Sequence, residues 1–321
     1  MVKRLSRLAA ALLLAVPALA LAAFPDKPLR IVIGFPPGGP LDQHARLLSD
    51  KLQAVLGQPV LVDYKSGAGG TVGAQEVLKT AADGYTLMLA NTGVMVINPA
   101  LYRDLPYNTL KNFIPVARTA MQPLALLVNP KVPANTLGEF VAYARARPGQ
   151  INYGSAGNGG ISHLVPEMFK AATGLFMVHI PYRGSAPAFT DLMGGQVQFM
   201  AESIPQAAVY HKQGKVRALA VTSKERNGAL PDVPTVMESG VKNFEVVGFY
   251  GFLVPFGTPA DVVAKLSDAF RQVLAMPDIR SRMLTQGADP AFLGADEFAK
   301  FLATEMPRWA AAVEASGAKP D

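Results

Sequence analysis

One order of elements, repeated along the chain, most constrains the fold of these 321 residues: a short apolar strand, a glycine-rich turn and an amphipathic helix. The first unit joins a strand at 29–35, the turn at 36–40 and a helix at 41–56 that Gly57 is expected to end. Apolar residues on one face of that helix recur at steps of four and three, at Leu41, Ala45, Leu48 and Leu52. Strands at 60–63 and 85–90, with a helix at 70–79, continue the alternation, which predicts a parallel sheet covered by helices.

The same order begins again in the second half of the chain. A strand at 124–128 and a helix at 137–146 precede a strand at 151–154 and the turn Ser155–Gly160. Ser162 is expected to cap the next helix, and Gly174 to end it. Further strands are predicted at 177–180, 218–222 and 246–255, and helices from a capping box at Thr258-Pro259-Ala260-Asp261, at 279–285 and at 296–315. The restart and the length predict two lobes, with the run at 246–255 returning the chain to the first.

We expect residues 1–22 to be a cleaved secretory signal and the mature protein to be periplasmic. Lys3, Arg4 and Arg7 precede the apolar run Leu8–Val16, and Ala20-Leu21-Ala22, or alternatively Ala18-Leu19-Ala20, has the form that signal peptidase accepts. The apolar run is too short for a membrane anchor, which needs about 20 residues. Removal of the three basic residues leaves 27 basic and 24 acidic side chains, a formal charge of +3 without a dense basic block, which argues against nucleic acid as a partner.

The chain contains no cysteine. This excludes disulfides, thiol catalysis and metal sites with cysteine ligands. An exported protein without disulfides needs a large apolar core, and a chain of this length, half of it apolar, can supply one.

Sequence motifs for cofactor binding and for hydrolysis are absent. The segment Ser66–Gly73 has Val72 where a dinucleotide fingerprint needs its third glycine, and no GxxxxGK[ST] motif occurs. The Gly-Ser pairs at 154–155 and 184–185 lack the spaced glycine of a nucleophile elbow. The four histidines, which form neither HExxH nor an i, i+4 pair, are His44, His163, His179 and His211. We therefore expect no cofactor, no metal and no enzymatic activity, although a catalytic triad assembled in space stays open.

Two glycine-rich loops, at residues 36–40 and 155–160, occupy equivalent positions in the two halves. Each follows a strand and opens a helix, a place where unpaired backbone N–H groups and the helix dipole can hold an anion. In open α/β sheets the ligand crevice lies beyond the carboxyl ends of the strands, so the two loops would meet in one cleft between facing lobes. Either loop alone is better explained as a tight turn, but the pair predicts a site for a small carboxylate.

Eight motifs follow one another along the mature chain. They are FPPGGPLDQHARLL at 35–48, GQPVLVDYKSGAGGTVGA at 57–74, DGYTLMLANTG at 83–93, INPALY at 97–102, NYGSAGNGGISHL at 152–164, VHIPYRGSAPAFTDLMGGQV at 178–197, RALAVTS at 217–223 and LPDVPT at 230–235. In this order they resemble the receptor family of tripartite tricarboxylate transporters, often called Bug receptors.

The resemblance implies an α/β fold of the type II periplasmic binding protein class, with two lobes of mixed sheets flanked by helices and joined by two crossing strands. We divide the chain into a first lobe at 23–123 and 247–321 and a second lobe at 124–246. The resemblance also implies carboxylate ligands, such as dicarboxylates, acidic amino acids or aromatic acids, held partly by backbone N–H groups and bridging waters. We expect a monomer that passes its ligand to membrane permease subunits. A periplasmic enzyme acting on an organic acid and a ligand-sensing subunit for a membrane sensor stay open as alternatives.

Ligand contacts follow from the resemblance position by position. In the first lobe they are Phe35, Gly38, Gly39, Leu41, Asp42, Asn91 and Thr92. In the second lobe they are Ser155, Ala156, Asn158 and Gly159, with His163, Arg183 and Ser185 at the margin, and Glu202. For His163 and Arg183, packing at the helix start and a solvated surface charge are equally good interpretations.

This chain departs from the family pattern at two of these positions. Leu41 replaces the threonine that commonly precedes Asp42, and Glu202 stands where many relatives have the second aspartate of a D-L-M-F-D run. With Val94-Met95, Leu41 predicts an apolar wall, and hence an aromatic or apolar dicarboxylate instead of citrate or aspartate. Alternatively, Leu41 turns into the packing face of its helix.

Overall fold

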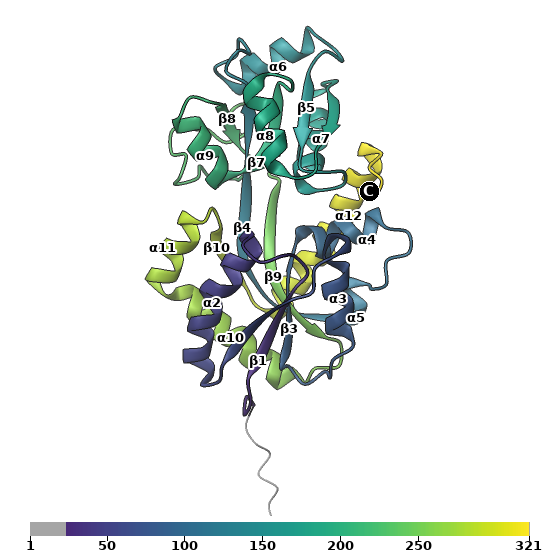
Figure 1. Cartoon of the computed structure of the whole chain (residues 1–321), viewed down its shortest axis with the longest axis vertical. Helices are drawn as coiled ribbons and strands as arrows, with labels where there is room; N and C mark the ends of the chain where they lie inside the picture. Colours follow the sequence, from purple (N-terminus) through teal and green to yellow (C-terminus); the bar gives the residue numbers. More distant parts are fainter. Residues whose placement is uncertain (1–23, 321) are drawn as a thin grey trace, which may run out of the picture.

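The computed structural model describes residues 24–320, so the predicted signal at 1–22 lies outside the described residues. The chain forms two lobes, one above the other, connected by two long strands (Figure 1). The described chain begins in the lower lobe, its middle forms the upper lobe, and its last helix rises from the lower lobe to the level where the two lobes meet (Figure 1). We call these the first and the second lobe.

The first lobe is built on a mixed sheet. Its strands, in spatial order, are β2 (Val60–Tyr64), β1 (Leu29–Ile33), β3 (Thr86–Asn91), β9 (Val247–Pro255), β4 (Phe113–Val128) and β10 (Asp289–Leu293). β1 runs parallel to β2 and β3, as predicted, whereas β9 is antiparallel to both β3 and β4. The returning strand therefore turns a parallel sheet into a mixed one.

Helices cover both faces of this sheet because its apolar residues alternate. Ile31 and Ile33 pack with α2 (Pro40–Leu56), α10 (Ala260–Ala275) and α11 (Pro277–Thr285). Val32, between them, faces the other side, toward α3 (Thr71–Leu78), η2 (Gly93–Ile97) and α12 (Ala295–Ser316). Short elements complete the lobe: η1 (Ala68–Gly70), α4 (Asn98–Leu101) and α5 (Thr109–Asn112).

The second lobe repeats this plan around the far end of β4. Its other strands are β5 (Asn152–Ser155), β6 (Val178–Pro181), β7 (Phe199–Ser203) and β8 (Arg217–Val221). β5 is parallel to β6 and β7, and β4 is antiparallel to β7 and β8. One face packs on α8 (Ser185–Gly194) and α9 (Ile204–Lys212), and the other on α6 (Leu137–Arg145) and α7 (Ile161–Thr173).

The two lobes are joined by β4 and β9, which pair antiparallel where they cross, with Gln122 opposite Gly248. The predicted fold class, two lobes with mixed sheets flanked by helices and joined by two crossing strands, is confirmed. β4 begins at Phe113, well before the strand predicted at 124–128. Of the two predicted boundaries between the lobes, the one at 123/124 falls inside β4 and the one at 246/247 falls at the start of β9. The division of the chain at these boundaries stays a prediction.

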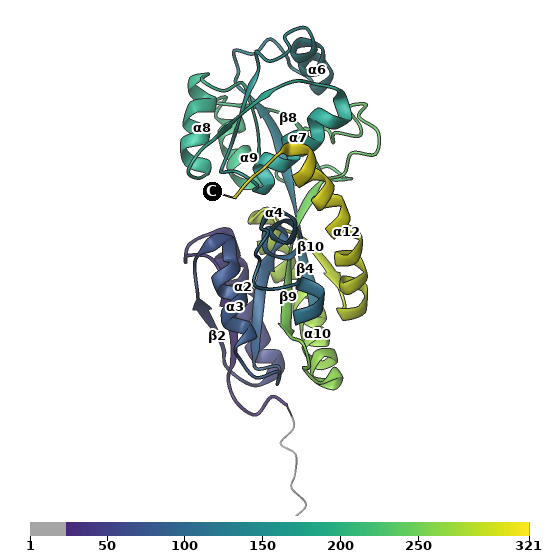
Figure 2. The same cartoon turned by 90° about the vertical axis from the view of Figure 1, so that its right-hand side faces the viewer.

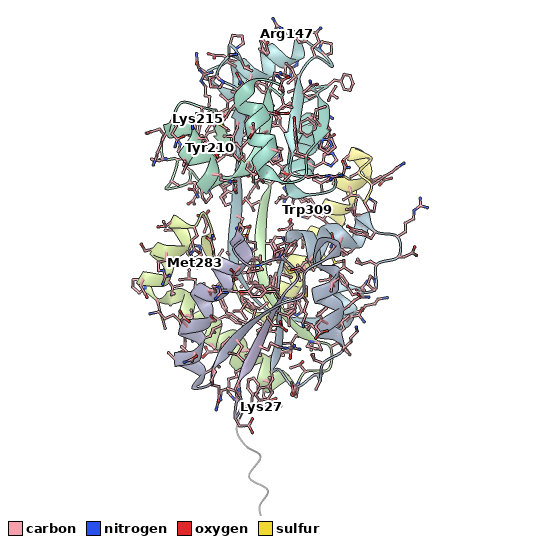
Figure 3. The ribbon with its side chains drawn as sticks, viewed as in Figure 1. Lys27, Arg147, Tyr210, Lys215, Met283 and Trp309 are labelled. Carbon is pink, nitrogen blue, oxygen red and sulfur yellow. The ribbon has the colours of Figure 1, made fainter. Side chains whose placement is uncertain are left out.

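A third connection runs along one side of the molecule. α12 extends from the first lobe toward the second, where it contacts α7 (Figure 2). Trp309, labelled in Figure 3, is fully buried on α12 at the level where the lobes meet. Its indole Nε1 donates to Glu305 Oε2 at 2.9 Å.

Several predicted element ends agree with the structure and two do not. Gly57 and Gly174 end α2 and α7 in the left-handed conformation, as predicted. α7, however, is capped by Gly160, and Ser162 Oγ instead accepts from the N–H of Ala156. The expected capping box at 258–261 is wrong, because Thr258 Oγ1 donates back to the carbonyl of Pro255 and α10 begins at Ala260. α8 and α9 were not predicted.

Candidate functional site

A cavity of about 880 Å³ lies between the two lobes, beside the crossing strands. The first lobe lines it with Phe35, Pro36, Pro37, Gly38, Gly39, Pro40, Leu41, Gln43, Asn91, Thr285, Gln286 and Gly287. The crossing strands contribute Gln122, Pro123, Leu124 and Tyr250. The second lobe contributes Ile161, Ser185, Glu202, Ser203, Pro205 and Gln206. The volume is that of a small-molecule site, in which both lobes and both crossing strands would contact one ligand.

The lining combines apolar side chains with uncharged amide and hydroxyl groups, with one exception. It includes no lysine, arginine or histidine, and Glu202 is its one carboxylate. Tyr250, on β9, is buried, and burial raises the pKa of its phenol, so this group stays neutral. A ligand carboxylate in the cavity would therefore be held by amide and hydroxyl groups, and not by a cationic side chain.

Asp42 holds the first glycine-rich loop from beneath and lies outside the lining. Its carboxylate accepts from the N–H of Gly38 at 2.7 Å, from Arg46 Nε at 2.8 Å and from the hydroxyl of Tyr64 at 2.6 Å. Burial alone would raise the pKa of Asp42, but these hydrogen bonds and the charge of Arg46 lower it below its usual value. The Gly38 N–H, predicted to be free for an anion, is thus occupied by Asp42.

Asn91 and Thr92, at the end of β3, have different positions. Asn91 lines the cavity, and its Oδ1 accepts from the N–H of Val94 at 3.1 Å. Thr92 is buried and binds the backbone of Phe249 on β9, accepting from its N–H at 2.7 Å and donating to its carbonyl at 3.3 Å. Thr92 therefore attaches β3 to a crossing strand and lies outside the cavity lining.

The second glycine-rich loop, residues 155–160, does not line the cavity. Its N–H groups are largely used within the loop: Ala156 donates to Ser162 Oγ at 3.0 Å, and Gly159 donates to His163 Nδ1 at 3.1 Å. The expectation of unpaired N–H groups there is therefore wrong for these two. Asn158 is half-buried and also outside the lining, so the second lobe reaches the cavity through Ile161, Ser185 and the β7–α9 junction instead.

Beneath this loop, three aromatic rings are stacked. His163 and His179 lie parallel with ring centroids 3.7 Å apart, and the ring of Tyr153 lies 4.9 Å from His179 and 6.3 Å from His163. Burial lowers the pKa of His179 to about 3 and also lowers that of His163. Both rings are therefore neutral near pH 7. His163 packs at the helix start, whereas Arg183 is exposed and outside the lining.

Ser155 and His179 are the serine–histidine pair that the fold brings together. The Ser155 hydroxyl lies 2.6 Å from His179 Nε2 and also donates to the carbonyl of Gly157. Ser155 is completely buried and does not line the cavity, so a substrate there would not reach it. A histidine with a pKa of about 3 is also a poor general base near neutral pH.

Sequence reasoning missed most of the lining outside the first loop. Tyr250 was inside a run read only as an apolar strand, and Gln122 and Pro123 lay before the strand predicted at 124–128. Pro205, at the first turn of α9, was a usable helix-start signal just after a strand, where ligand sites gather. Among residues 24–320, no cluster of three histidine or acidic side chains could hold a metal ion, and no helix there could cross a membrane.

Comparisons with known proteins agree with this arrangement. A family model for the "Tripartite tricarboxylate transporter family receptor" matches residues 44–318. Protein BugT of Bordetella pertussis is 36% identical over 297 residues, which cover 92% of this chain and 91% of BugT. The solved structure of R. palustris Rpa4515 with adipate is 31% identical, with a TM-score of 0.80, covering 93% of this chain and 100% of that one. MatC from Rhodopseudomonas palustris, with bound malate, is 33% identical, with a TM-score of 0.74, covering 90% and 100%.

Proposed function

Because the chain belongs to the receptor family of tripartite tricarboxylate transporters, we propose that it is a periplasmic receptor for a small organic carboxylate, which it passes to membrane permease subunits. The observation that carries this proposal is the cavity of about 880 Å³ between the lobes, which both lobes and both crossing strands line. A ligand bound there holds the lobes together, and its release requires them to separate. A membrane partner can respond to that difference.

Seven of the residues expected at the ligand carry the proposed contacts. They are Phe35, Gly38, Gly39, Leu41, Asn91, Ser185 and Glu202, all in the cavity lining. Asp42 affects the ligand site indirectly, by holding the first loop through the N–H of Gly38. Thr92 does so by binding the backbone of β9. The segment 155–159 and His163 contribute to the packing of the second lobe and do not contact the ligand. Arg183 lies exposed on the surface of that lobe.

The proposed ligand has an apolar or aromatic middle, as in an apolar dicarboxylate. Val94 and Met95 do not support this, because both are buried in the first-lobe core and outside the lining. Leu41 is only 5% exposed and packs mainly within its helix layer. Support comes instead from Phe35, Leu124 and Ile161, since an apolar ligand body buried against them gains roughly 25 cal/mol per Å². The adipate bound to Rpa4515 is a ligand of this type, whereas the malate of MatC is shorter and more polar.

A thermal-shift screen on the full mature protein tests the proposal. We expect adipate or an aromatic dicarboxylate to raise the melting temperature more than citrate or aspartate at equal concentration. A ligand at about 100 times its Kd adds about 2.7 kcal/mol to the free energy of unfolding. A larger shift with citrate or aspartate would refute the apolar middle, and no shift with any carboxylate would refute the receptor function.

Ligand recovery separates the receptor from an enzyme. After prolonged incubation and denaturation of the protein, chromatography should return the bound acid chemically unchanged and in a 1:1 ratio to protein. Formation of a product in more than stoichiometric amount would favour an enzyme. Co-purification of the loaded receptor with permease subunits, and not with a sensor kinase, would distinguish transport from sensing.

A further inference from the structure

Glu202 is the carboxylate of the cavity, and the fold fixes its position. It lies near the end of β7, where it is paired with Ala125 on β4, one of the two crossing strands. Its side chain is only 8% exposed although the residue lines the cavity. The carboxylate is therefore held at the cavity wall, largely removed from solvent.

The two oxygens of Glu202 are not equally satisfied. Oε1 accepts from the backbone N–H of Ser203 at 2.8 Å. Oε2 is buried and has no hydrogen-bond partner among residues 24–320. A buried carboxylate oxygen without a donor has lost its water without replacement, which is costly. A donor brought into the cavity would remove this cost.

Nothing in the cavity lining offers Glu202 an opposite charge. The lining has no lysine, arginine or histidine, and its other titratable group is the phenol of Tyr250. Glu202 also takes part in no ion pair among the described residues. A ligand carboxylate placed against Glu202 would therefore meet an uncompensated like charge in a poorly solvated place.

We propose that Glu202 selects ligands with a hydrogen-bond donor at the end opposite their carboxylate. The ligand class is an apolar monocarboxylate that carries a hydroxyl or ammonium group at its far end. This group takes the place of the second carboxylate in the dicarboxylate considered above. The inference rests on the proposed receptor function, because it needs a ligand in this cavity. Glu202 would thus favour a ligand whose far end carries a hydrogen-bond donor over one whose far end carries a second carboxylate.

Four six-carbon acids that differ only at the far end test this. Hexanoate ends in a methyl group, adipate in a carboxylate, 6-hydroxyhexanoate in a hydroxyl and 6-aminohexanoate in an ammonium. By calorimetry, we expect the wild-type protein to bind the hydroxyl or the ammonium analogue at least tenfold more tightly than hexanoate and adipate. Preference for one of the two donors then identifies which group meets Glu202.

Variants at position 202 link the preference to this side chain. Glu202→Gln removes the charge, so it should lower the affinity for 6-aminohexanoate at least tenfold. It should also bring the affinity for adipate up to that for the donor analogues. Glu202→Asp keeps the charge and should keep the order of the four acids. Glu314→Gln removes an exposed charge on α12 and should leave all four affinities unchanged. Circular dichroism of each variant confirms folding, and the order of the four acids in the wild-type protein carries the test if Glu202→Gln does not fold.

Three results would overturn the inference, and they are distinguishable. If wild type binds adipate as tightly as both donor analogues, or Glu202→Gln keeps the wild-type order, Glu202 does not select a donor and the receptor function stands. If wild type binds none of the four acids while citrate or aspartate binds, this ligand class is wrong and carboxylate binding stands. If no carboxylate binds at all, the inference and the proposed receptor function fail together.

Discussion

Asp42 shows how one side chain can shape a binding loop without touching the ligand. It lies in the first turn of α2, where a negative charge is favoured by the helix dipole. From there it accepts the Gly38 N–H, so the loop before the helix is tied to the helix itself. Arg46, four residues on, and Tyr64 on β2 orient the same carboxylate. The shape of the first loop thus depends on a group buried behind it.

Replacement of Asp42 by alanine should lower both stability and ligand affinity. The N–H of Gly38 and the hydroxyl of Tyr64 would each lose a charged acceptor, and we expect a loss of about 1–3 kcal/mol in the free energy of unfolding. Urea unfolding followed by circular dichroism measures it. Asp50→Ala, at an exposed position of the same helix, is the matched control and should change stability by less than about 0.5 kcal/mol. Equal effects of the two substitutions would contradict the role given to Asp42.

The stacked histidines predict a dependence of stability on pH. Burial, then the neighbouring His163, lowers the folded-state pKa of His179 from 6.5 to about 3. Between these values the unfolded chain binds the proton and the folded protein does not, so the free energy of unfolding falls as the pH is lowered. The slope is at most about 1.4 kcal/mol per pH unit for each histidine.

Unfolding of His179→Gln between pH 6.5 and 4 checks this dependence. The variant lacks one titrating group, so its stability should fall less steeply with acid than that of wild type. It keeps part of the slope, because burial also lowers the pKa of His44 to about 3. Parallel pH profiles for the two proteins would show that His179 does not contribute.

At the scale of elements, two glycines allow the lobes to touch on either side of the cavity. Gly159, in the loop before α7, has its backbone against Leu101 of α4, and an added Cβ would lie 2.4 Å from Leu101 Cδ2. Gly287, after α11, meets Pro205 of α9, where an added Cβ would lie 2.3 Å from Cδ. Such distances are far below van der Waals contact. Both positions have a φ in the left-handed region, +67° and +71°, which also favours glycine.

The substitution Gly287→Ala should therefore lower the free energy of unfolding by more than backbone strain alone would. Gly214 has almost the same φ, +68°, but open space around it, so Gly214→Ala measures the strain by itself, about 1 kcal/mol. We expect Gly287→Ala to lose more stability than this and also to weaken ligand binding, because the rigid Pro205 ring and α9 must move away. Thermal unfolding and calorimetry measure the two effects. Equal losses in the two variants, with unchanged affinity, would mean that the lobes do not need this contact.

The sequence predicted elements better than it predicted the site, for a physical reason. Helices and strands depend on local periodicity and on glycine ends, so α2 and α7 were predicted with nearly correct bounds. The cavity depends on which elements meet in space. The part of β4 before residue 124 was not predicted, because Pro115 and Pro123 interrupt its apolar pattern. Gln122, a residue of the cavity lining in that part of the strand, was therefore missed as well. The loop at 155–160 looked like an anion site, but its N–H groups bind its own side chains.

At the scale of the whole molecule, the lobes are linked by β4, β9 and α12, and the cavity lies beside the two strands. Motion of the lobes must therefore bend the crossing strands and shift the contact between α12 and α7. Because the single tryptophan, Trp309, is buried on α12, its fluorescence should report this shift. The absence of cysteine makes the chain suitable for a direct measurement of lobe motion by paired labels.

Val209 on α9 and Leu284 on α11 are exposed, 52% and 46%, and belong to different lobes on the same side of the molecule. Spin labels on cysteines at these two positions should come closer when a saturating carboxylate is added, because a ligand that contacts both lobes favours the arrangement in which they are together. Labels at Leu284 and Leu61, which is 58% exposed on β2 of the same lobe, form the control pair and should keep their distance. Pulsed electron resonance measures both. If the pair across the cavity is also unchanged at demonstrated saturation, the ligand binds in a rigid pocket, and a membrane partner would have to recognise something other than lobe closure.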